Sequence, residues 1–111
     1  MPYDEGLAAR VRDLVHEHGP TEEKRMFGGL AFMLGGHMAV CASRDGGLLV
    51  RTDGSESEAL LRLDHVEPMR MGGQSSRTWL RVGPKALASE DQLLAWVERG
   101  VATARAQPPK G

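Results

Sequence analysis

The residues of this chain that could bind a metal ion are four histidines and one cysteine, and their spacing does not favour a site. His16 and His18 are two residues apart on a predicted helix, so their side chains point to roughly opposite sides. His37 and Cys41 share one face of a predicted strand, but four residues of strand span about 13 Å. We therefore expect no metal site and no cofactor, with solvated histidines and a buried cysteine.

Nucleophilic catalysis and phosphate binding are also disfavoured. Cys41 stands between Val40 and Ala42 in a strand that should be central, where a thiol has a raised pKa and behaves as a small hydrophobe. The Gly28-Gly29 pair has neither a Walker lysine nor a Gly-x-Gly-x-x-Gly pattern, so a close approach of backbone or a bulge explains it better. We expect no catalytic residue, and hence no enzyme.

The predicted strands carry several arginines, which could form a basic patch on the surface. The predicted interaction face consists of four strand residues, Arg70, Arg77, Trp79 and Arg81. A tryptophan flanked by arginines could stack a nucleic-acid base or anchor a protein, and arginines also pack over tryptophan without any partner. Because the formal net charge is -1, we favour a protein partner over nucleic acid.

Methionine is frequent on the predicted strands, at Met26, Met33, Met38, Met69 and Met71. Flexible methionine side chains line adaptable interfaces, but they more often fill gaps in a core. We therefore interpret them first as core residues.

The first half of the chain predicts a helix followed by a three-stranded meander. Residues 4–18 carry an apolar stripe at helical spacing behind an N-cap at Asp4. Two apolar runs, residues 26–34 and 37–43, flank a glycine turn and read as a hairpin at the centre of a sheet, covered on at least one face. A third strand is predicted at residues 48–51.

The second half predicts a short helix, two strands and a closing helix. The short helix covers residues 56–63, and the strands cover residues 66–71 and 77–82. Pro68 cannot donate to a ladder, so its position should lie at an edge or a bulge. Ser89 and Gln92 form a capping box for the last helix. The predicted fold is α+β, a five-stranded antiparallel sheet with flanking helices in the order α-β-β-β-α-β-β-α.

Length and composition predict one domain over residues 1–104 and a flexible tail over residues 105–111, which contains Pro108-Pro109. The apolar runs are shorter than the ~20 residues of a membrane span, so we expect no membrane association. The single cysteine and the absence of a signal-peptide pattern at the N-terminus indicate a cytoplasmic protein.

The chain resembles the N-terminal domain of the TfoX/Sxy family over residues 3–103. The resemblance lies in Arg25, Met26, Phe27, Gly28 and Gly29, which precede the glycine turn and the Met38-Ala39 return of the hairpin. It continues in the strand at Trp79 and in the helix at 95–100.

This resemblance implies a fold similar to that of type III secretion chaperones, with a curved antiparallel sheet and flanking helices. Longer members regulate natural competence in bacteria as coactivators beside a DNA-binding activator, and they carry a second, helical domain. We expect this chain to be a member with the N-terminal domain only. The resemblance transfers no catalytic residues. Our first hypothesis is a non-enzymatic module that binds a protein partner in the transcription machinery, with homodimerisation through an exposed sheet edge as a corollary. One alternative is a small-ligand-binding domain or an unrecognised enzyme that uses the concavity of the sheet. The other is direct nucleic-acid binding through Arg70, Arg77 and Arg81.

Overall fold

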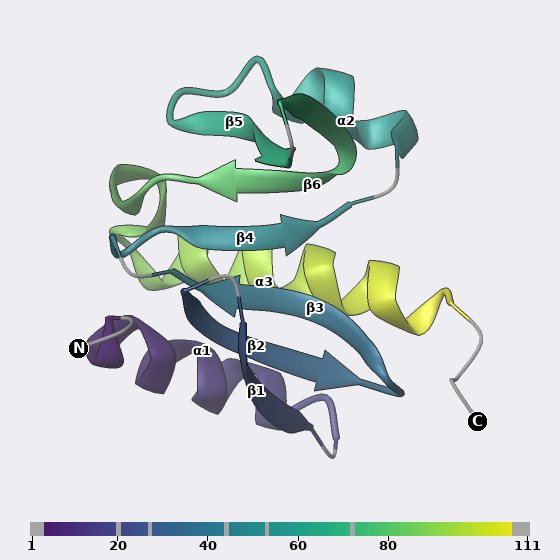
Figure 1. The fold of residues 1–111 in the computed structure, drawn as a ribbon. Helices are drawn as coiled ribbons and strands as arrows, with labels where there is room; N and C mark the ends of the chain where they lie inside the picture. Colours follow the sequence, from purple (N-terminus) through teal and green to yellow (C-terminus); the bar gives the residue numbers. More distant parts are fainter. Residues whose placement is uncertain are drawn as a thin grey trace.

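The structure is a computed structural model. It describes residues 4–19, 21–26, 28–43, 45–52, 54–71 and 73–107, without the side chains of residues 71 and 74–77. Within these residues the chain forms one antiparallel sheet of six strands, three α-helices and a short 3-10 helix (Figure 1).

The sheet has the strand order β1-β2-β3-β4-β6-β5, so the first four strands form a meander. Their bounds are β1 Glu22–Met26, β2 Gly29–Leu34, β3 His37–Ala42, β4 Leu48–Arg51, β5 Val66–Met71 and β6 Gln74–Val82. Figure 1 shows the strand direction turning from β5 towards β1, which is the ordinary twist of a sheet.

Two long helices cover one face of the sheet. α1 (Glu5–His16) packs on β2 and β3, and α3 (Glu90–Arg105) packs on β3 and β4 (Figure 1). The short α2 (Gly54–Leu60) contacts β6, and a 3-10 turn, η1 (Pro84–Leu87), leads towards α3. The main hydrophobic core therefore lies between the sheet and the two long helices, around Phe32, Val40 and Val97.

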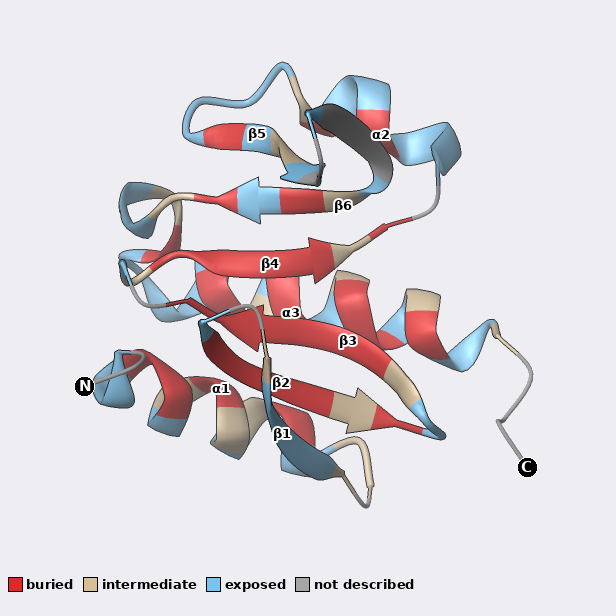
Figure 2. Cartoon of the chain, in the orientation of Figure 1, coloured by how far each residue is buried: buried red, intermediate tan, exposed pale blue. Residues whose placement is uncertain are grey.

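Several predicted elements are confirmed. Asp4 caps α1 by accepting a hydrogen bond from the Leu7 N–H, and Ser89 and Gln92 form the capping box of α3. The hairpin of β2 and β3 lies inside the sheet, and Figure 2 shows β3 buried over most of its length. Residues 38–42 are all apolar because both faces of the strand are buried, Ala39, Val40 and Ala42 in the main core and Met38 and Cys41 on the opposite face.

The prediction of five strands is wrong, since β1 is a sixth. Residues 22–25 lie between the predicted helix and the first predicted strand, but Glu22–Met26 pairs antiparallel with β2. The predicted strand 26–34 is thus the end of one strand and the whole of the next, and Gly28 adopts a φ of +72° between them. A two-residue connection needs such a conformation, which glycine adopts without strain.

Two bounds in the second half also differ from the prediction. The helix expected at residues 56–63 is α2, which covers Gly54–Leu60. The strand expected at residues 77–82 begins earlier, at Gln74, so the connection between the last two strands is shorter than expected. Pro68 lies on the edge strand β5 beside a shift of register, as its missing N–H requires.

Residues 108–111 of the predicted tail lie outside the described residues. Among the described helices, none has the length and apolar character that crossing a membrane would require.

Candidate interaction surface

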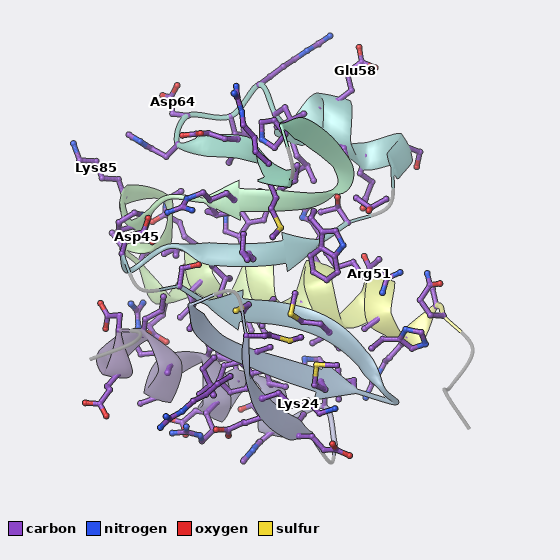
Figure 3. The ribbon with its side chains drawn as sticks, viewed as in Figure 1. Lys24, Asp45, Arg51, Glu58, Asp64 and Lys85 are labelled. Carbon is purple, nitrogen blue, oxygen red and sulfur yellow. The ribbon has the colours of Figure 1, made fainter. Side chains whose placement is uncertain are left out.

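The face of the sheet opposite α1 and α3 carries a second apolar cluster. Its buried centre consists of four side chains, Ala31, Met38, Cys41 and Leu49. Four partly buried side chains pack around this centre, Met26, Met33, Met69 and Trp79. We call these eight residues the open-face cluster. In Figure 3 the sulfur atoms gather over this side of the sheet.

A bulge in β3 decides which residues reach the open face. Phe32 pairs with Val40 but Met33 pairs with Met38, so Ala39 is an extra residue in β3. Ala39 and Val40 both belong to the core on the helix side, and the alternation resumes after them. The bulge therefore places Met38 on the face of Cys41, and the expectation that His37 shares that face is wrong.

Cys41 is a free and fully buried cysteine at the centre of this cluster. Burial raises the pKa of its thiol to about 11, so the thiolate is scarce at neutral pH. The prediction of a buried thiol with a raised pKa is confirmed, and the residue behaves as a small apolar group.

The four residues of the predicted interaction face have different surroundings in the structure. Trp79 faces the open side, where the guanidinium of Arg51 stands 5.5 Å from the centre of its ring. Arg81 forms an ion pair with Asp45. Arg70 is exposed on the edge strand β5. The side chain of Arg77 lies outside the described residues, so its predicted place beside Trp79 stays a prediction.

A hollow of about 600 Å³ borders the open-face cluster. Leu49 and Met69 contribute apolar surface to it. Two arginines and two carboxylates contribute charge, Arg70, Arg81, Asp45 and Glu67. Glu67 is directly opposite Arg81 in the ladder of β5 and β6, so the charges of the hollow largely balance.

The predicted family motif lies in the hairpin of β1 and β2. Arg25 is exposed and Met26 is partly buried at the end of β1, while Phe27 lies outside the described residues. A Cβ atom added at Gly29 would stand 2.2 Å from the carbonyl oxygen of Ala42 on β3. Gly29 is thus required for close approach of backbone, and Gly28 is required for the turn, so these glycines serve the fold.

No group of three or more metal-binding side chains is found in the part of the chain that the structure describes. His16 ends α1 and His18 follows it in a turn, and neither belongs to such a group. The residues that sequence reasoning missed are those of β1. Lys24 lies directly opposite Ala31 and therefore borders the open-face cluster (Figure 3). β1 carries no local strand signal, because residues 22–25 are all charged and Met26 is its one apolar residue.

The family model of the TfoX N-terminal domain matches residues 13–104, which is most of the chain. The chain belongs to the TfoX N-terminal domain family. No curated protein and no solved structure gives a match to the chain. The expected family membership is confirmed.

Proposed function

We propose that this TfoX-type domain is a non-enzymatic protein-interaction module that binds a partner segment on the open face of its sheet. The observation that supports this is the open-face cluster, which no helix among the described residues covers. Methionine side chains are unbranched and polarisable, so such a surface can repack around an inserted apolar side chain. Trp79 adds a large anchor of the type that is enriched at interface centres.

Charge around the cluster defines the partner further. Lys24, Arg51 and Arg70 border the cluster from β1, β4 and β5, and within the described residues none of them forms an ion pair with a carboxylate. Arg51 is held over Trp79, which leaves the edge of its guanidinium able to bind an acidic group. The partner we propose is therefore an apolar protein segment with flanking acidic side chains.

The proposed role of this binding is in bacterial transcription regulation of the competence type. Membership of the TfoX N-terminal domain family supports it. The partner would then be a component of the transcription machinery, and the domain would act as an accessory to it.

The test is site-specific photo-crosslinking in cells that express the full chain. A photoreactive phenylalanine analogue replaces Met33 on the open face, and in a matched control it replaces Glu98, which is exposed on α3. We expect a discrete protein adduct from position 33 that is absent from position 98. Mass spectrometry of the adduct should identify an apolar segment with acidic neighbours.

Crosslinking to a basic segment, to nucleic acid or equally from both positions would contradict the proposal. The structure supports nucleic acid less well than a protein as the partner, because Arg81 is already paired with Asp45 and Arg51 covers part of Trp79. Direct binding of a duplex should lose affinity steeply with salt, since it would depend on phosphate contacts.

A small ligand is a second candidate, and the hollow beside Leu49 supports it. Its volume of about 600 Å³ lies in the usual range for ligand sites, and two arginines and two carboxylates line it, Arg70, Arg81, Asp45 and Glu67. In this case Leu49→Trp, which would fill the hollow, should abolish the stabilisation that a bound ligand gives in a thermal-shift assay.

A further inference from the structure

The edge strand β1 presents unpaired main-chain groups in a defined pattern. β1 ends the strand order and pairs with β2 alone in the described sheet. Met26 pairs with Gly29 to close the hairpin, and from there hydrogen-bonded and non-hydrogen-bonded pairs alternate. The main-chain N–H and C=O groups of Glu23 and Arg25 therefore point away from β2. Figure 2 shows β1 as exposed.

The side chains of β1 follow an order that an antiparallel copy would complement. Two acids, Glu22 and Glu23, precede two bases, Lys24 and Arg25, and all four are exposed. When such a strand meets its own copy in antiparallel orientation, the acidic half of each lies beside the basic half of the other. A parallel copy would place like charges together. Edge strands that avoid pairing with their own copies often carry charges of one sign, which repel each other. Because β1 carries two acidic and two basic residues, its charges do not prevent antiparallel self-pairing.

The ladder with β2 also fixes which side chains could meet. Glu23 is opposite Phe32 of the helix-side core, and Lys24 is opposite Ala31 of the open face. Glu23 and Arg25 thus share the helix side of the sheet. A two-fold axis through Lys24, perpendicular to the sheet, places Glu23 directly opposite Arg25 of the second copy, and the reverse.

The contacts around Glu23 support this register. Its carboxylate accepts two hydrogen bonds from Arg12 on α1, at 2.7 and 2.8 Å, which hold it in place beside the edge. In the paired strands it would lie between Arg12 of its own chain and Arg25 of the second copy. Lys24 would meet its copy at the axis, with a Glu22 diagonally on each side.

We propose that β1 pairs antiparallel with β1 of a second copy of this chain, which joins two sheets into one continuous sheet with two-fold symmetry. The open faces of both copies then lie on the same side. A five-residue strand pair buries little area, so the dimer should be weak and depend on concentration. This proposal stands independently of the proposed function, which concerns the open face.

The test compares molar mass by sedimentation across a concentration series for the full chain and two double variants. E22K/E23K makes β1 wholly basic, and K24E/R25E makes it wholly acidic. We expect the unaltered chain to approach the mass of a dimer, and each double variant alone to remain a monomer. An equimolar mixture of the two variants should recover the dimer, because opposite charges again face each other.

The matched control is E17K/E58K, which changes the net charge as much as E22K/E23K does but at two exposed positions, one directly after α1 and one in α2. It should dimerise like the unaltered chain. Recovery of the dimer on mixing shows that both β1 variants are folded, even though E23K loses the contact with Arg12. A monomer at all concentrations, variants that dimerise alone, or folded variants that do not associate on mixing would overturn the proposal.

Discussion

Gly100 is the residue that lets α3 lie close to the sheet. A Cβ atom added at Gly100 would lie 2.4 Å from the carbonyl oxygen of Ala39 and 2.7 Å from Cγ1 of Val40. Both neighbours belong to the bulged part of β3, which is fully buried and cannot withdraw. The absence of a side chain at position 100 thus sets the separation between the helix and the central strand.

We expect Gly100→Ala to lower the free energy of unfolding by about 1–3 kcal/mol, as overpacked cores do. The matched control is Gly6→Ala in α1, where the nearest atom to the added Cβ would be Asp4 Oδ1 at 3.4 Å. Alanine is the better helix former, so this control should raise the free energy of unfolding by up to about 1 kcal/mol. Urea denaturation measures both changes, and effects of the same sign would contradict this account.

Elements with an apolar pattern are predicted well from the sequence. The strands at 48–51 and 66–71 match β4 and β5, because alternating or continuous apolar residues bounded by turn residues mark them. β1 is missed because four of its five residues are charged. Its extended conformation comes from pairing with β2, and this is tertiary information that a local pattern does not contain.

For the candidate site too, the local sequence pattern does not predict which residues reach the open face. The strand methionines were interpreted as core residues, and Met38 is indeed buried. Residues 38–42 are all apolar, however, so no polar residue reports which side each one faces. The bulge at Ala39 decides this, and it alone gives Met38 and Cys41 a common face.

The stabilisation that comes from the contact between Arg12 on α1 and Glu23 on β1 should depend on pH. The hydrogen bonds from Arg12 lower the pKa of Glu23, so the folded state is stabilised by this carboxylate while it is ionised. That contribution is present above the ordinary pKa of glutamate and is lost as the pH falls through the lower pKa of the folded state. Glu23→Gln should therefore cost about 0.3–1 kcal/mol at pH 7, as exposed ion pairs do.

The measurement is the free energy of unfolding of the unaltered chain and of Glu23→Gln as a function of pH, at a dilution where the chain is monomeric. The difference between them should shrink on acidification. Glu22→Gln is the matched control, since the carboxylate of Glu22 forms no ion pair with any described residue. A difference that is equal for both variants, or constant with pH, would assign the effect to something other than the Arg12 contact.

At the scale of the molecule, α1 and α3 cover one face of the sheet, and no helix among the described residues covers the other. The chain contains two tryptophans, and one lies on each side. Trp96 belongs to the helix-side core and is 8% exposed, whereas Trp79 packs at the border of the open-face cluster. Each stands beside an arginine at a similar distance, 5.4 Å for Arg99 and 5.5 Å for Arg51, so the arginine contact does not distinguish them.

This arrangement predicts that single-tryptophan variants will report the two faces separately. Trp96→Phe retains Trp79, whose fluorescence should be quenched efficiently by acrylamide, because the quencher reaches the uncovered face. Trp79→Phe retains Trp96, which the helical layer should protect. In denaturant acrylamide should quench both variants alike, because both tryptophans are then exposed. This is the control for any difference in quenching that does not depend on the fold. Equal quenching of the folded variants would mean that the open face is covered in solution, by a second copy or by another part of the chain, and the surface proposed for partner binding would then not be available.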